Sequence, residues 1–119
     1  VYASTHPHEK VCIDTTGSVV HLPLEILTHI KSFKNSIFLD TKEELIDDMI
    51  TLYLKQPKPV IWGAYSTEFK DKQSYKDIVK TLYPKLLYSR RRKYMSYSRI
   101  SIDFTEHKKK GFDILKFLQ

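Results

Sequence analysis

Three short stretches of this chain carry residue types that could bind an anion. The first is Asp14-Thr15-Thr16-Gly17-Ser18, a cluster of small polar residues that follows an apolar run. Small residues let backbone amides approach an anion or a hydroxylated substrate, and Thr and Ser add hydroxyl donors. The stretch therefore predicts a binding loop, although an ordinary strand-to-helix turn would have the same composition.

The other two stretches are cationic. Lys58 lies between two prolines in a long loop, where a lysine could close on phosphate groups; a surface lysine in a turn is the alternative. Residues Arg90–Lys93 are four successive cations on a predicted helix, so they point around most of its circumference, at about 100° per residue. Some of them must face the packed side or an anion, and Arg suits bidentate contacts to carboxylate or phosphate. An ordinary solvated basic face accounts for at least two of the four.

Composition bounds the class of protein. The chain has 119 residues, which is the size of a single domain, and its hydrophobic share of 41% excludes an obviously disordered chain. The one cysteine, Cys12, lies in an apolar run and predicts a buried residue without a disulfide, which favours a cytoplasmic location.

No apolar run reaches the roughly 18 residues of a membrane span, so no membrane partner is predicted. His6 and His8 have no Cys or acid pair to complete a metal site, so no metal ligand is predicted.

The net charge of +6 is unevenly distributed. Between Lys85 and Lys110 there are nine Lys or Arg residues against two acids, Asp103 and Glu106. Such a region indicates an anionic partner such as phosphate groups, nucleic acid or a membrane face, or else a solvated helix face. No ladder of aromatic residues typical of RNA readers accompanies these cations, which makes nucleic acid the less favoured partner.

Hydrophobic spacing predicts alternating strands and helices. Strands are expected at residues 11–15, 36–40 and 100–103. The first two helices are expected from Pro23 to about Phe33 and, after an N-cap at Thr41 with Glu44 completing a capping box, to about Leu54. Two further helices are expected from about Ser74 to Tyr97, with a possible bend at Pro84, and over residues 112–118. Residues 55–74 form a loop long enough to be functional, and they are expected to act as a lid.

This alternation predicts an α/β fold with a parallel sheet of about three strands, four to five helices, and helices on both faces of the sheet. Ligands of such sheets bind beyond the carboxyl ends of the strands. Residues 14–18, 40–42 and 103–105 are therefore expected to lie along one rim.

The order and spacing of these features resemble the C-terminal half of shikimate-kinase-like P-loop phosphotransferases. The resemblance covers roughly Val11 to Leu118. In that family a buried strand ends in a Ser-Thr-Gly-Gly-Gly loop that touches the acceptor, and the corresponding run here is Asp14–Ser18. A second strand ending in Leu-Asp and followed by an acidic helix is similar to Leu39-Asp40 and the helix after it. The short strand near 100–103 and a closing helix complete the resemblance.

The resemblance also implies roles for the cationic residues. The family carries an Arg-Pro-Leu motif on a lid whose Arg reaches the nucleotide phosphates, and Lys58 stands at that position. It then has an Arg-x-Pro-Leu-Tyr helix whose Arg contacts the substrate carboxylate, and the matching positions are Arg90 and Tyr94. The resemblance thus implies an ATP- and Mg²⁺-dependent small-molecule kinase in which Lys58 and Arg90 are catalytic, Lys58 binds the nucleotide, and residues 14–18 with Arg90 and Tyr94 bind the acceptor. A non-catalytic relative or binding module that uses the basic residues 85–110 for an anionic partner, either nucleic acid or protein, is the alternative.

Several departures from the family pattern bear on the substrate. Thr16 and Ser18 replace two of the three glycines, Lys58 replaces the lid Arg, and Arg92 and Lys93 replace the Pro-Leu pair. We therefore expect an acceptor other than shikimate.

The sequence contains no Gly-x-x-x-x-Gly-Lys-Ser/Thr loop, and it does not start with Met. We expect the chain to be a segment, residues 1–119, of a longer kinase-like domain, inactive alone. In the family the P-loop strand lies between the first two strands expected here. Without it, the strand at residues 11–15 would lose a hydrogen-bonding neighbour, at a cost of about 1–3 kcal/mol for each buried unpaired group. We expect a need for the missing N-terminal half, a partner chain or a rearranged sheet.

Overall fold

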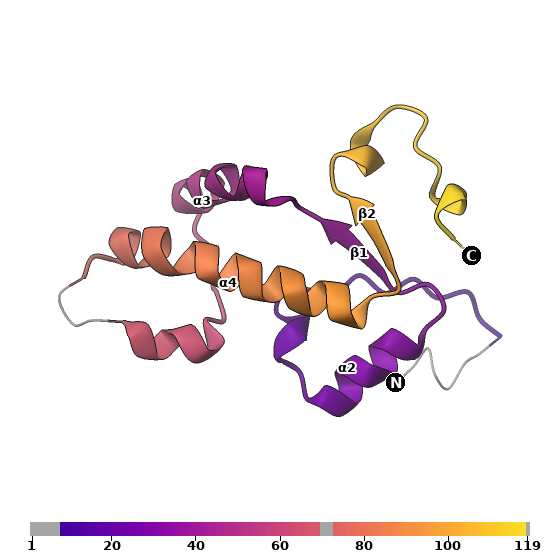
Figure 1. Ribbon diagram of the computed structural model, residues 1–119, viewed down its shortest axis with the longest axis horizontal. Helices are drawn as coiled ribbons and strands as arrows, with labels where there is room; N and C mark the ends of the chain where they lie inside the picture. The colour runs from indigo at the N-terminus through magenta and orange to yellow at the C-terminus, as the bar shows by residue number, and fades with distance from the viewer. Residues whose placement is uncertain (1–7, 70–72, 119) are drawn as a thin grey trace.

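The computed structural model describes residues 8–69 and 73–118 (Figure 1). The predicted N-terminal segment before His8 and residues 70–72 of the predicted lid lie outside the described residues. The described part is α/β and mostly helical, with a two-stranded parallel sheet. Its elements are η1 (Val19–His21), α2 (Leu24–Ser32), β1 (Ile37–Asp40), η2 (Glu43–Leu45), α3 (Ile46–Lys55), η3 (Gly63–Glu68), α4 (Tyr75–Tyr97), β2 (Ile100–Asp103), η4 (Glu106–Lys108) and η5 (Ile114–Lys116), where η denotes a 3₁₀ helix.

Helix α4 is the longest element, and the other elements gather along it (Figure 1). Ser74 caps its first turn, because the Ser74 hydroxyl accepts a hydrogen bond from the Asp77 backbone N–H at 3.2 Å. Pro84 lies within the helix and does not end it. Four apolar side chains at helical spacing are buried on one face: Ile78, Val79, Leu82 and Leu86.

Two shorter helices contribute to the same core. Helix α3 lies alongside the N-terminal half of α4 and buries Ile46 and Tyr53, and the Tyr53 ring stacks on Tyr83 of α4 with centroids 4.7 Å apart (Figure 1). Helix α2 contacts α4 nearer its C-terminal end and buries Leu27. The predicted helices after Pro23 and from Ser74 are confirmed.

Strands β1 and β2 pair in parallel, with Ile37 opposite Ile100 and Asp40 opposite Asp103. The pairing continues past β1, because the Phe104 N–H donates to the Asp40 carbonyl at 2.9 Å. Both predicted strands are therefore confirmed. The two carboxyl ends meet at one edge, as the predicted parallel arrangement requires.

The predicted strand at residues 11–15 is wrong, and with it the expectation of three strands and of a buried Cys12. Residues 11–17 have no regular structure and are exposed, with Ile13 retaining 59% of its accessible surface. A strand requires a neighbour that pairs with its backbone, and among the described residues the sheet comprises β1 and β2 alone. An apolar run indicates a preference for burial and does not supply that neighbour.

Two other expectations need correction at element ends. The helix predicted from an N-cap at Thr41 begins later, with η2 after Lys42 and α3 from Ile46, and neither start has a side-chain cap. The closing helix predicted over residues 112–118 is one 3₁₀ turn, Ile114–Lys116, whose Leu115 is 71% exposed. With its apolar side chain in solvent, this turn lacks the packed face that stabilises most protein helices.

We expect the α4 core to dominate stability. Leu86 is 1% exposed, so Leu86→Ala should lower the free energy of unfolding by about 2–5 kcal/mol in urea denaturation followed by circular dichroism. Leu52 of α3 is 64% exposed and offers the same substitution as a control, with an expected change within about 0.5 kcal/mol. Equal losses in the two variants would contradict this assignment of the core.

Candidate functional site

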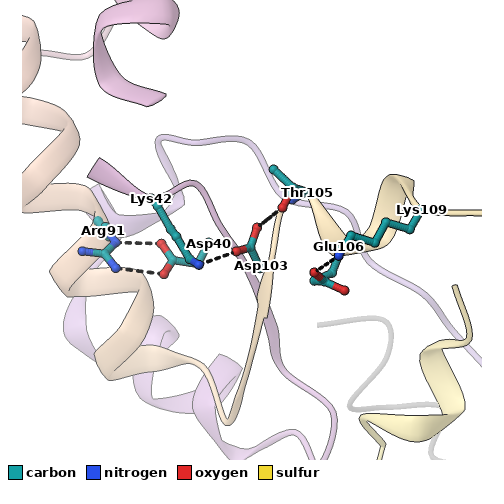
Figure 2. A network of polar contacts seen from close by, with 7 residues as sticks. All are labelled: Asp40, Lys42, Arg91, Asp103, Thr105, Glu106 and Lys109. Carbon is teal, nitrogen blue, oxygen red and sulfur yellow. Dashed lines mark hydrogen bonds and ion pairs between the residues drawn. The ribbon is translucent and has the colours of Figure 1, made fainter. Parts of the chain in front are cut away.

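The carboxyl ends of β1 and β2 bring two of the three predicted rim stretches together. Arg91 of α4 donates from Nε and Nη2 to the two carboxylate oxygens of Asp40, at 2.7 and 2.9 Å (Figure 2). Lys42 forms an ion pair with Asp103 at 2.8 Å, and the Thr105 hydroxyl and backbone N–H both donate to Asp103 (Figure 2). The rim predicted from residues 40–42 and 103–105 is therefore present as a polar network.

The charges in this network neutralise one another. The Lys42 ammonium and the Thr105 donors hold the pKa of Asp103 well below its usual range. The Asp40 carboxylate raises the pKa of Arg91, and Lys42 is likewise held in its charged form by Asp103. Because each of these carboxylates is already paired, this part of the rim fits a structural clamp between α4 and the strand ends better than a site for a charged ligand.

A second cluster forms where the loop before η1 meets the C-terminal half of α4. The Tyr94 hydroxyl donates to the Gly17 carbonyl, although the two residues are 77 positions apart in the sequence. A Cβ atom at Gly17 would lie 3.3 Å from the Tyr94 hydroxyl and 3.4 Å from Arg90 Nη1. The structure thus brings together Gly17, Arg90 and Tyr94, three of the residues predicted to bind the acceptor.

Arg90 is the charged centre of this cluster. Its Nη2 donates to the Ile61 carbonyl at 3.0 Å, which brings the loop between α3 and η3 to the same place. Its Nε is buried and has no hydrogen-bond partner among the described residues. No carboxylate of the described residues pairs with Arg90, whereas the next residue, Arg91, has Asp40 and Glu43. Arg90 is therefore a partly buried cation that has no carboxylate partner within the described part of the chain.

His21, the last residue of η1, belongs to the cluster and was not predicted from the sequence. A Cβ atom at Gly63 would lie 2.9 Å from the His21 ring, so Gly63, the first residue of η3, packs directly against this imidazole. Gly63 also has a positive φ of 59°. Burial, with Arg90 and Lys93 nearby, lowers the pKa of His21 below its usual 6.5. His21 Nε2 is buried without a hydrogen-bond partner among the described residues. No sequence pattern singles out His21, because its role depends on Gly63 and Arg90, which are remote in the chain.

The other predicted site residues lie at the margin of the cluster or away from it. The Thr16 and Ser18 hydroxyls are hydrogen-bonded to each other at 2.9 Å, while Asp14 and Thr15 are exposed. Lys58 is exposed, and its backbone carbonyl accepts a hydrogen bond from Tyr53 at 2.9 Å. In residues 8–69 and 73–118, no hydrogen bond or ion pair joins the Lys58 side chain to the cluster. The predicted lid does reach Arg90, through Ile61 and not through Lys58.

The basic region between Lys85 and Lys110 is largely engaged within the chain. Lys85 forms an ion pair with Glu68, and Lys109 with Glu106. The Lys108 ammonium lies 4.3 Å from the centre of the Phe104 ring. Together with Arg90 and Arg91, five of the nine cations thus have intramolecular contacts, but only Lys85, Arg91 and Lys109 pair with carboxylates.

The cluster around Arg90 combines polar groups from three parts of the chain. Its donors are a guanidinium and an imidazole, and hydroxyl groups lie close by in residues 16–18. No group of three or more His, Cys, Asp or Glu side chains in the described part of the chain is arranged to hold a metal ion. The chain contains no Gly-x-x-x-x-Gly-Lys-Ser/Thr loop, so its residues do not by themselves fit the phosphates of ATP.

Comparison of the chain with protein-family models, with curated proteins and with solved structures finds no match. Among the described helices, none is both long enough and apolar enough to cross a lipid bilayer.

The lowered pKa of His21 predicts a pH-dependent stability. The unfolded chain binds the His21 proton more tightly than the folded chain, so the stability rises with pH between the lowered folded pKa and about 6.5. We expect His21→Gln to flatten the dependence of the unfolding free energy on pH between about 5 and 7, measured by urea denaturation. His29 is exposed, and His29→Gln is the matched substitution of a second histidine outside the cluster. Equal slopes for all three proteins would contradict the buried placement of His21.

Proposed function

We propose that this chain supplies the acceptor side of a small-molecule phosphotransferase related to shikimate kinase, with Arg90 holding an acidic group of the acceptor. The observation that carries the proposal is the convergence of Gly17, Arg90 and Tyr94. These residues were selected from the sequence because they match the family's acceptor loop and its Arg-x-Pro-Leu-Tyr helix. The Tyr94–Gly17 contact joins residues 77 positions apart, as an acceptor site built from these two stretches would require.

The local chemistry supports an acidic acceptor. A partly buried guanidinium that lacks a carboxylate partner among the described residues favours a bound carboxylate or phosphate, because charge-assisted hydrogen bonds strengthen where water is excluded. The Thr16 and Ser18 hydroxyls lie beside Gly17 and offer donors and acceptors to a hydroxylated molecule. An acceptor with both an acidic group and a hydroxyl group fits these donors.

ATP and Mg²⁺ enter this proposal only through the family resemblance. The residues described here do not cradle nucleotide phosphates, so in the proposed enzyme those groups are held by residues outside this cluster. What Arg90, Gly17 and Tyr94 contribute is the binding and orientation of the acceptor, which in phosphoryl transfer is a large part of catalysis. The assignment of Lys58 to the nucleotide phosphates remains a prediction.

The test is phosphoryl transfer by the complete gene product. With ATP, Mg²⁺ and a panel of small hydroxy acids, ADP release measures turnover. Arg90→Gln should reduce kcat/KM by about 10- to 100-fold for the accepted substrate, because a charged hydrogen-bonding group is lost. Arg92→Gln removes the same charge from an exposed position two residues away and should change kcat/KM less than about twofold.

Two outcomes would count against the proposal. Equal effects of the two Arg substitutions would remove Arg90 from the acceptor site. A folded complete gene product that transfers no phosphoryl group to any hydroxy acid would favour the non-catalytic alternative, in which Arg90 binds an anion without chemistry.

A further inference from the structure

The exposed side of α3 is acidic. Glu44 of η2 and Asp47 and Asp48 of α3 are exposed carboxylates, and none of the three forms an ion pair among the described residues. Leu52, about one turn after Asp48, keeps 64% of its accessible surface. The acidic face, defined as Glu44, Asp47, Asp48 and Leu52, therefore combines negative charge with an exposed apolar side chain.

One side of α4 is basic. Tyr88, Arg92 and Met95 follow one another at spacings of four and three residues, which places them on the same side of the helix. Tyr88 and Met95 are 39% and 51% exposed. Arg92, and Arg99 just after the end of α4, are exposed and have no carboxylate partner in residues 8–69 and 73–118. Tyr88, Arg92, Met95 and Arg99 together are called the basic face.

The acidic face and the basic face adjoin. Helix α3 lies alongside α4 (Figure 1), and Arg91 Nη1 forms an ion pair with Glu43 at 3.3 Å. Glu43 directly precedes the first carboxylate of the acidic face, and Arg91 directly precedes Arg92 of the basic face. The ion pair therefore lies where the negative charge of α3 gives way to the positive charge of α4.

A surface that carries both signs of charge side by side limits the kind of partner it fits. Nucleic acid and an anionic membrane present negative charge alone, so the acidic face would repel either of them beside the basic face. A fitting partner offers a basic surface to the acidic face and an acidic surface to the basic face. A second copy of this chain does so, because rotation about a two-fold axis brings each face onto its counterpart.

We propose that the chain forms a two-fold dimer in which the acidic face of each copy docks on the basic face of the other. Asp48 is followed four positions later by the apolar Leu52, and Arg92 is preceded at the same spacing by Tyr88. When α3 of one copy runs antiparallel to α4 of the other, the charged pair and the apolar pair therefore meet together. The inference goes beyond the proposed function and does not depend on it, since Arg90 lies outside both faces.

The dimer is expected to be weak, because each face has few apolar side chains and exposed ion pairs contribute little. We expect a dissociation constant of about 10–100 μM, so that dilute protein is monomeric and its unfolding free energy is that of the monomer. The nuclease-treated complete gene product is measured by sedimentation velocity from about 1 to 300 μM. Raising NaCl from about 50 to 500 mM should weaken association at least about tenfold, because salt screens the paired charges.

Charge reversal tests which faces meet. Arg92→Glu and Asp48→Arg should each weaken association about tenfold or more, because each places like charges together at both contacts of the dimer. An equal mixture of the two variants should regain the dimer, since one contact keeps Asp48 with Arg92 and the other joins the two introduced charges in reverse. Lys31→Glu and Glu25→Arg make the same charge changes on exposed positions of α2 and should leave association within about twofold.

Four results would overturn the proposal: a monomer throughout the concentration range at low salt, a dimer that high salt does not weaken, a dimer unaffected by Arg92→Glu, or a mixture that associates no better than its separate variants. A self-association lost on nuclease treatment would also overturn it, with a nucleic acid as the occupant of the basic face. Circular dichroism checks that each variant is folded, and the salt series needs no variant, so it remains decisive if one misfolds. Phosphoryl transfer by a strict monomer would reject the dimer and keep the kinase, whereas a dimer without transfer would do the reverse.

Discussion

The burial of one apolar face of α4 is the constraint on which the other features depend. Val79 and Leu86 are almost completely removed from solvent, and α3 and α2 pack along the same helix (Figure 1). Since this face fixes the rotation of α4 about its axis, it also fixes where every later residue of the helix points. The directions of Arg90, Arg91 and Tyr94 follow from packing about one to four turns away.

Successive positions on such a helix can serve unrelated purposes. Arg91 faces the strand ends and clamps Asp40, which ties α4 to the sheet. Arg90, about 100° further back around the helix, faces Gly17 and Ile61 instead. The Asp40 carboxylate balances the charge of Arg91, whereas no carboxylate among the described residues pairs with Arg90. The structural role of Arg91 and the binding role proposed for Arg90 thus belong to neighbouring residues of α4.

Local patterns were sufficient to predict most elements, because their signals lie within a few residues. The strands at 37–40 and 100–103 and the helix capped by Ser74 follow from apolar spacing and a cap. The expected strand at residues 11–15 failed for the opposite reason. Its apolar residues indicate that the segment favours burial, but a strand forms only when another strand offers an unpaired edge. Neither β1 nor β2 pairs with this segment. The closing helix likewise lacked a surface to pack on.

For the site, the sequence predicted residue types and missed the contacts made by backbone. Gly17, Arg90 and Tyr94 were chosen because they match family motifs in order, and Lys58 was chosen by the same reasoning. The structure brings the first three together, and their role in an acceptor site stays a prediction. The group of the lid that actually meets Arg90 is the carbonyl of Ile61, which any residue could supply, so no side-chain pattern could reveal it. His21 was missed because its place in the cluster depends on contact with Gly63, which is remote in the sequence. A neutral carbonyl does not balance the charge of Arg90, whereas the Asp40 carboxylate balances that of Arg91, so the two neighbouring arginines differ in the partner that the fold gives them.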